Sequence, residues 1–296
     1  MQALAGCDVL VGEPALCGPI VDQCSNLMWF QSTFAGCNQL LTASARRDYT
    51  VTRLAGCFGP DMAEYTMLHI LAQERAYLAQ SEAQQQRAWH DTRGENQGPG
   101  SGYRRLPSLT LGVIGLGDIG TEIARVATQG LRMRVVGCRR DSKPRLSDTE
   151  AGVAKVFGLD ELSAFLGSAD YLVSVLPSTP ATRGLLDGGV LESCAARQPI
   201  APTLINVGRG DLLTEGTILT ALDRGWLSHF VGDVFTPEPL PEESPLWGHP
   251  RVTITPHNSA VTKPEDVVAA FESNLMRYEA GGVSSLKNVF NWEAGY

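Results

Sequence analysis

The chain has 296 residues, a length that fits one large or two medium-sized domains. Hydrophobic residues make up 43% of it and charged residues 19%, which is ordinary for a globular protein. The formal net charge of −8 disfavours binding to nucleic-acid phosphates, so we expect a protein that acts on small molecules and has no nucleic-acid partner.

The seven cysteines are odd in number, and their spacing contains no Cys-x-x-Cys pair and no Cys/His cluster typical of a metal site. We therefore expect free thiols, no metal and a reducing compartment. The first residues lack the basic and apolar regions of a signal peptide, which favours a cytoplasmic protein. No apolar run approaches the roughly 18 residues that a membrane span needs, so we expect no membrane association.

The first part of the chain alternates apolar strands with polar connections. Short apolar runs predict buried strands at 8–12, 27–33 and 49–54. A helix is predicted from Asp61 to about Trp89, because apolar residues recur there at helical spacing. A glycine-rich polar segment follows at 91–105, where we expect the chain to pass into a second domain.

From Leu109 the pattern becomes a regular alternation of strands and helices. A strand near 109–114, a helix and a strand ending at Gly137 form a βαβ unit. Further strands are predicted at 171–176, 203–207, 230–234 and 252–255, with helices at 162–166 and 218–224 between them and a last helix at 265–280. The order predicts an α/β fold with a doubly wound parallel sheet.

A glycine-rich loop joins the first strand of this alternation to its helix. Gly115 permits a tight turn, Gly117 lets the backbone approach a pyrophosphate, and Gly120 lets the helix pack on the strand. Asp118 and Ile119 open the helix, whose free N–H groups would face the phosphates. The loop predicts a dinucleotide site, and a glycine-rich turn without a ligand is the alternative.

The end of the next strand bears on which dinucleotide binds. A carboxylate there would hold the 2′-hydroxyl of the adenosine ribose, but the sequence has Cys138, Arg139 and Arg140, with Lys143 nearby. Guanidinium groups suit a 2′-phosphate in charge and geometry, so we predict NADP(H) in preference to NAD(H). The arginines also disfavour a methyltransferase that uses S-adenosylmethionine, whereas a solvated basic turn stays possible.

Three later segments place reactive side chains just after predicted parallel strands, where open α/β sheets carry their active sites. They contain Arg209, Glu238 and His257. Alone, each has an ordinary interpretation: a turn residue, a solvated carboxylate and a histidine at the rim of a core. Their shared position at the ends of strands makes them candidates for one catalytic site.

Five motifs, in this order and spacing, resemble the D-isomer-specific 2-hydroxyacid dehydrogenases, the family that includes glyoxylate and hydroxypyruvate reductases. The motifs are VIGLGDIG at 113–120, LPSTPATRGLL at 176–186, LINVGRGDLL at 204–213, GDVFTPEPLP at 232–241 and SPLWGHPRVTITPH at 244–257. The resemblance covers nearly the whole chain.

The resemblance implies catalytic roles residue by residue. Arg209 matches the arginine that holds the carbonyl and carboxylate oxygens of the substrate. Glu238 matches the family's glutamate, and His257 matches its acid/base histidine. A carboxylate hydrogen-bonded to an imidazole stabilises the protonated ring, so such a pair could deliver a proton to the substrate oxygen as hydride arrives.

The resemblance also implies binding positions. Those for the cofactor, besides the glycine loop and the arginines, are Leu176, Pro177, Val207 and Asp233. Asp233 matches a position near the nicotinamide carboxamide, and a cap at the strand end is its alternative. Ala35 and Gly36 match a loop whose backbone N–H groups bind the substrate carboxylate, and an ordinary turn is the alternative there.

The domain organisation implied by the family is discontinuous. Residues 1–90 and 265–296 would form a smaller flavodoxin-like substrate domain, with the dinucleotide-binding Rossmann domain at 91–264 inserted in it. Family members normally have two further strands before the one at 8–12, so we expect a shortened domain with that strand at its edge. The helix from Asp61 resembles the dimer-forming region, so we expect a homodimer.

The sequence therefore predicts an NADPH-dependent reductase of small 2-oxo acids such as glyoxylate or hydroxypyruvate. One alternative is a nucleotide-sensing binding protein of the same fold, as in the C-terminal-binding-protein corepressors, which Arg139 and Arg140 disfavour. A second alternative is a truncated, inactive paralogue.

Overall fold

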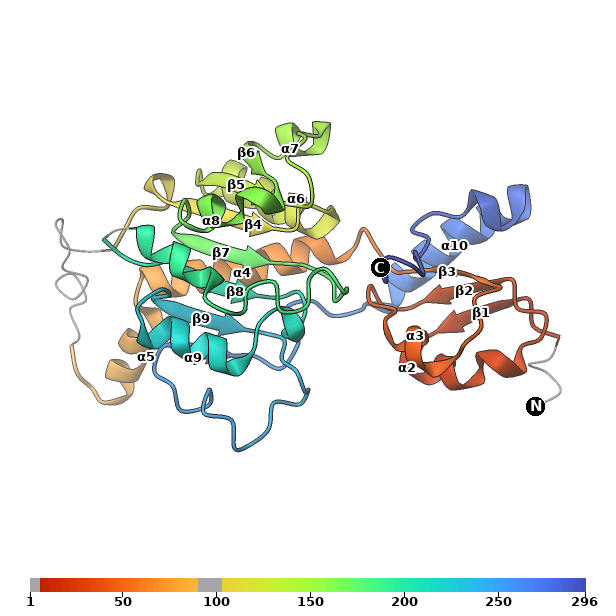
Figure 1. Ribbon diagram of the computed structural model, residues 1–296, viewed down its shortest axis with the longest axis horizontal. Coiled ribbons are helices and arrows are strands. Elements are labelled where there is room, and N and C mark those ends of the chain that lie inside the picture. The colour runs from red at the N-terminus through yellow and green to blue at the C-terminus, as the bar shows by residue number, and fades with distance from the viewer. Residues whose placement is uncertain (1–5, 90–102, 198) are drawn as a thin grey trace. The chain divides into compact units, whose positions relative to one another are not determined.

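The computed structural model describes residues 6–89, 103–197 and 199–296 (Figure 1), so most of the predicted crossing segment at 91–105 lies outside the described residues. The chain divides into two compact units. Unit 1 comprises Met1–Phe58, Pro177–Thr182 and Val261–Tyr296, and unit 2 comprises Gly59–Leu176 and Arg183–Ala260.

Unit 2 is built on a seven-stranded sheet in the order β10-β9-β8-β7-β4-β5-β6, and every neighbouring pair is parallel. The strands are β4 (Thr110–Ile114), β5 (Arg134–Cys138), β6 (Val153–Phe157), β7 (Tyr171–Ser174), β8 (Thr203–Asn206), β9 (His229–Gly232) and β10 (Val252–Ile254). The sheet confirms the predicted doubly wound fold. Strand β6 escaped prediction because it lies at an end of the sheet and exposes Lys155, which interrupts the apolar pattern.

Helices cover this sheet. They are α4 (Phe58–Glu74), α5 (Tyr77–Gln85), α6 (Asp118–Arg125), α7 (Leu146–Glu150), α8 (Leu162–Leu166) and α9 (Glu215–Asp223). On one face, Phe165 of α8 and Leu222 of α9 join Leu172, Leu204 and Phe230 of the strands in one buried core. Burial of these side chains is the main force that holds the helices on the sheet.

The long helix predicted from Asp61 to about Trp89 is two helices, α4 and α5, because Ala76 between them takes the left-handed φ of +48°. The predicted domain boundaries at residues 90 and 264 also differ from the observed division. Tyr65 of α4 hydrogen-bonds to Thr255 and Gln73 to Thr203, and these polar contacts fasten α4 to unit 2.

A buried ion cluster secures the last residue of α4. The carboxylate of Glu74, 5% exposed, accepts hydrogen bonds from the Tyr171 hydroxyl at 2.6 Å and from Nε of Arg104 at 3.1 Å. A guanidinium nitrogen of Arg104 also lies 3.5 Å from Asp170, which accepts a hydrogen bond from Nε of Arg197 at 2.9 Å. Since Tyr171 begins β7, the cluster lies at the amino ends of the strands.

Unit 1 contains a three-stranded parallel sheet of β1 (Val9–Gly12), β2 (Trp29–Ser32) and β3 (Thr50–Thr52), in that order. Strand β1 lies at one end of it. The helices are α2 (Pro14–Cys17), α3 (Gln39–Ala43) and the terminal α10 (Pro264–Gly281). Trp29, fully buried in β2, stacks on Phe271 of α10 with ring centroids 5.4 Å apart.

No helix among the described residues combines the length and the apolar character required to cross a bilayer.

Candidate active site

The three candidate catalytic residues follow neighbouring strands of unit 2. Arg209 comes after β8, Glu238 after β9 and His257 after β10, and these strands are adjacent in the sheet. Because parallel strands point the same way, their carboxyl ends meet at one edge. Arg209, Glu238 and His257 therefore lie on loops at the same end of the parallel strands.

His257 and Glu238 form a hydrogen-bonded pair. Nδ1 of His257 lies 2.9 Å from Oε2 of Glu238, and Oε1 of the glutamate accepts a hydrogen bond from the Phe235 backbone N–H at 2.9 Å. An ionised carboxylate can only accept, so Nδ1 carries a proton toward Glu238 and Nε2 is left for another partner. With its side chain 51% exposed, His257 can exchange a proton with a bound molecule.

The loop that carries Arg209 is held from within. The buried side chain of Asn206 donates to the backbone oxygen of Arg209 at 2.9 Å and accepts from the N–H of Gly208 at 3.3 Å. A Cβ at Gly210 would overlap the backbone of Phe235, so the loops after β8 and β9 pack together only with glycine there. Sequence reasoning missed Asn206, although an asparagine that ends a buried strand signals a side chain that caps a loop.

The glycine loop fits a dinucleotide phosphate group. Gly115 has a φ of +104°, and a Cβ at Gly120 would overlap the carbonyl oxygen of Gly115, so both positions require glycine. Gly117 precedes α6 and has open space where a Cβ would stand. This opening and the first N–H groups of α6, at Asp118 and Ile119, are the features that let a phosphate approach the backbone.

Of the remaining predicted cofactor positions, Leu176 lies beside this loop. A Cβ at Gly115 would lie 3.2 Å from the side chain of Leu176. A Cβ at Gly208, which follows the buried Val207, would lie 2.6 Å from the backbone oxygen of Leu176. Pro177, also predicted to contact the cofactor, begins the short segment that belongs to unit 1.

The two arginines after β5 differ in their surroundings. Arg139 is 7% exposed, and its guanidinium pairs with the buried Asp148 at 3.1 and 2.8 Å and also donates to the backbone oxygen of Lys143. Arg140 is exposed. The structure thus turns Arg139 inward, where it holds the loop together, and leaves Arg140 at the surface of the loop. Both were predicted to face a 2′-phosphate.

Asp233, predicted near the nicotinamide, is fully buried. Its carboxylate accepts hydrogen bonds from the hydroxyl of Thr255 at 2.6 Å and from the backbone N–H groups of Asn258 and Ser259 at 2.9 Å each. These contacts are those of the alternative interpretation, a cap at the strand end, because every bond is made to the segment that follows β10.

The predicted carboxylate loop lies in unit 1, between β2 and α3. Ala35 and Gly36 are half-buried, and the turn before them is held by Ser32, whose hydroxyl donates to the Phe34 oxygen at 2.8 Å. Within the described part of the chain, the N–H groups of Ala35 and Gly36 donate to no backbone oxygen. Such N–H groups can bind an anion.

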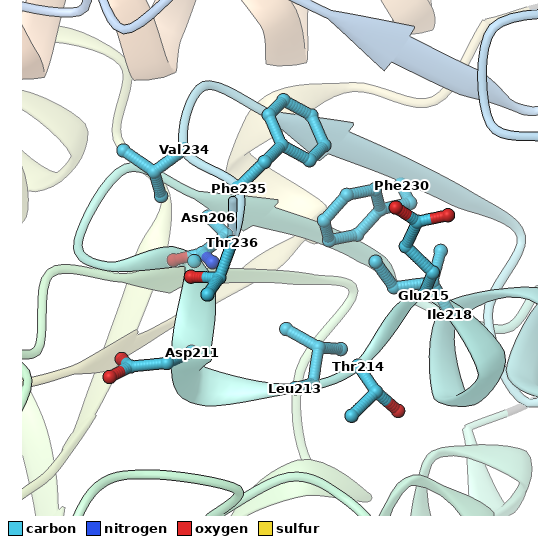
Figure 2. A pocket seen from close by; sticks show the side chains of 11 residues that line it. Asn206, Asp211, Leu213, Thr214, Glu215, Ile218, Phe230, Val234, Phe235 and Thr236 are labelled. Carbon is cyan, nitrogen blue, oxygen red and sulfur yellow. The ribbon is translucent and has the colours of Figure 1, made fainter. Parts of the chain in front are cut away.

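A cavity of about 220 Å³ lies between the loops after β8 and β9 and helix α9 (Figure 2). Figure 2 shows the rings of Phe230 and Phe235 and the side chain of Leu213 around it, with Asp211 and Glu215 nearby. The residues that line it do not include Arg209, Glu238 or His257. The cavity therefore adjoins the two loops but is separate from the His257–Glu238 pair.

Comparison with known proteins gives a consistent result. Residues 67–259 match the model of the D-isomer specific 2-hydroxyacid dehydrogenase family, NAD binding domain. A D-isomer specific 2-hydroxyacid dehydrogenase family protein from Aeromonas salmonicida subsp. salmonicida A449 is 38% identical, with a TM-score of 0.83 over 98% of this chain and 87% of that one.

Two further solved structures contain a cofactor. The NADPH-dependent glyoxylate/hydroxypyruvate reductase from Sinorhizobium meliloti, in complex with NADP and sulfate, is 29% identical, with a TM-score of 0.83 over 98% of this chain and 87% of that one. The D-isomer specific 2-hydroxyacid dehydrogenase from Xanthobacter autotrophicus Py2, in complex with NADPH, is 30% identical, with a TM-score of 0.78 over 93% of this chain and 81% of that one.

Proposed function

The chain belongs to the D-isomer-specific 2-hydroxyacid dehydrogenase family, oxidoreductases that act on CH–OH donors, and we propose that it reduces small 2-oxo acids such as glyoxylate and hydroxypyruvate with NADPH. The observation that carries the proposal is the hydrogen bond of 2.9 Å between His257 and Glu238 at the carboxyl edge of the sheet. It supplies an oriented proton donor at the end of the fold where this kind of sheet binds its ligands.

The glycine loop at 115–120 would hold the nicotinamide cofactor, which when bound would supply hydride for the carbonyl carbon of the acid. His257 holds a proton on Nε2 and gives it to the carbonyl oxygen, while Glu238 accepts from Nδ1 and orients the ring. Arg209 binds the anionic substrate and stabilises the negative charge that develops on that oxygen. The N–H groups of Ala35 and Gly36 bind the substrate carboxylate.

The proposed preference for NADPH is assigned to the loop after β5. Arg140 is the exposed guanidinium that binds the 2′-phosphate, and Arg139, paired with Asp148, keeps that loop in shape. The similar S. meliloti and X. autotrophicus proteins were solved with NADP and NADPH, which supports the same choice here.

We expect Arg140→Ala to raise the dissociation constant of NADPH by about 10-fold or more and to leave that of NADH nearly unchanged, because a charge-assisted hydrogen bond to the 2′-phosphate contributes about 1.5–3 kcal/mol. Fluorescence titration with both cofactors measures this difference. Arg139→Ala serves as the comparison: loss of the loop's internal ion pair should weaken both cofactors and lower the melting temperature. Equal weakening of NADPH and NADH by Arg140→Ala would contradict the assignment.

The overall proposal is tested by the loss of NADPH absorbance with glyoxylate, hydroxypyruvate and pyruvate in parallel, repeated with NADH. We expect turnover with the two smaller or hydroxylated acids and faster turnover with NADPH. Binding of NADPH without turnover of any acid would favour the nucleotide-sensing or inactive alternatives.

We also propose a cytoplasmic homodimer. Leu68 on α4 and Tyr77 and Leu78 on α5 are each more than 60% exposed, and large apolar side chains exposed on consecutive helices are typical of an association surface.

A further inference from the structure

The backbone of His257 is strained. Its φ is +51°, in the left-handed region that non-glycine residues rarely adopt. A residue keeps this conformation only when its surroundings hold it there, and such strain is concentrated at functional sites. The contacts that hold the backbone of His257 therefore help to set the orientation of its imidazole.

Asp233 supplies those contacts. Its backbone oxygen accepts the His257 N–H at 2.9 Å, and its carboxylate accepts the N–H groups of Asn258 and Ser259 at 2.9 Å each. Three successive backbone N–H groups are thus bound to one fully buried residue. The side chain of Asp233 can fix the loop only as long as the carboxylate itself is held in place.

A chain of two hydroxyl groups holds the carboxylate. The Thr255 hydroxyl lies 2.6 Å from Oδ1 of Asp233 and 2.6 Å from the Tyr65 hydroxyl. A carboxylate only accepts hydrogen bonds, so Thr255 donates its single hydroxyl proton to Asp233. The proton between Tyr65 and Thr255 must then come from Tyr65. The direction of the chain is therefore Tyr65 to Thr255 to Asp233.

The surroundings keep Tyr65 a donor. Burial raises the pKa of Tyr65, so the phenol stays protonated, and its ring packs on His69 with centroids 4.4 Å apart. Burial also lowers the pKa of His69. Tyr65 lies on α4, close to where the chain enters unit 2 at Gly59, and Thr255 lies just before the chain leaves it at Ala260. The hydroxyl chain ties these two segments of unit 2 together.

We propose that Tyr65 and Thr255 are positioning residues for proton transfer by His257, acting through the buried carboxylate of Asp233. The inference rests on the proposed function for its kinetic consequence. Its structural consequence, a loop at 255–260 that is held by the two hydroxyls, stands independently of which substrate is reduced.

The test removes each hydroxyl without changing the shape of the side chain. Thr255→Val should lower kcat by about 10- to 100-fold, because a small displacement of the acid/base group is costly. Tyr65→Phe, which leaves Thr255 bound to Asp233, should lower kcat by about 3- to 10-fold, the equivalent of one net hydrogen bond. The KM for NADPH should change by less than about twofold in both, since uniform binding is untouched.

Two comparisons separate positioning from general damage. Thr255→Ser keeps the hydroxyl and should retain kcat within about threefold. The double variant Tyr65→Phe/Thr255→Val should be no slower than Thr255→Val, because without the Thr255 hydroxyl the Tyr65 hydroxyl no longer acts on Asp233. Thr253→Val is the matched control, since its hydroxyl, on β10 two residues before Thr255, bonds to His229 and not to Asp233. Its kcat should match that of the wild type.

The proposal is overturned if Thr255→Val keeps wild-type kcat, if Thr253→Val is equally slow, or if the two single losses simply multiply in the double variant. Hydrogen–deuterium exchange of residues 255–260 gives a second readout that needs no substrate. Faster exchange of the Asn258 and Ser259 amides in Thr255→Val than in Thr253→Val supports the positioning role even if wild type reduces none of the acids offered. Equal exchange in the two variants contradicts it.

Discussion

Replacement of His257 by alanine is expected to lower kcat by about 10²- to 10⁴-fold, the usual contribution of a positioned acid/base group. Dissociation of NADPH should change little, because the glycine loop and Arg140, which are assigned to the cofactor, lie after different strands. Glu238→Gln should have a smaller effect, since an amide oxygen can still accept from Nδ1 of His257 but carries no charge.

Steady-state rates with NADPH and fluorescence titration of the cofactor measure the two quantities separately. His249→Ala is a suitable control, because His249 contacts the backbone N–H of Arg251 before β10 and plays no part in the proposed reaction. Turnover that persists in His257→Ala, or a loss of NADPH affinity as large as the loss of rate, would show that the role of His257 has been misassigned.

Glu74→Ala should cost about 3–5 kcal/mol in the unfolding free energy of unit 2, the usual effect of removing one partner from a buried ion cluster. The substitution leaves the guanidinium of Arg104 beside Asp170 and Arg197 without its main carboxylate, and it also deprives the Tyr171 hydroxyl of its acceptor. The loss of unfolding free energy should be large because the Glu74 side chain is only 5% exposed.

Urea denaturation followed by circular dichroism gives the free energy, with a transition for each unit allowed in the fit. Glu122→Ala is the matched control: it removes a carboxylate paired with Arg125 at the surface of α6, where solvent screens the ion pair, and should change stability little. If Glu74→Ala and Glu122→Ala unfold at the same urea concentration, the cluster has no special role in holding α4 on the sheet.

The sequence predicted the elements that local pattern specifies. Alternating apolar runs identified six of the seven strands of unit 2, and the position of His257 after β10 followed from the parallel order. Strand β6 was missed because an edge strand with an exposed Lys155 lacks a continuous apolar run.

What the sequence could not predict depends on partners far along the chain. In the sequence Arg139 and Arg140 are two equivalent basic residues, and only folding brings Asp148 against Arg139. In the same way, α4 continues the first segment of the chain, yet Thr255 and Tyr171 hold it in unit 2. Buried polar partners leave no periodic signal, so such pairings need the three-dimensional structure.

Helix α4 forms hydrogen bonds at both ends of the parallel strands. Its Tyr65 bonds to Thr255 at the carboxyl edge, and its Glu74 bonds to Tyr171 at the amino edge. A substitution that strengthens the contacts around Glu74 would make the protein more heat-tolerant. It would also make α4 a more rigid support for the His257 loop, which α4 contacts through Tyr65. Variants selected for heat resistance along α4 should therefore show altered temperature optima for turnover, whereas stabilising changes on the surface of α6 should leave the optimum where it is.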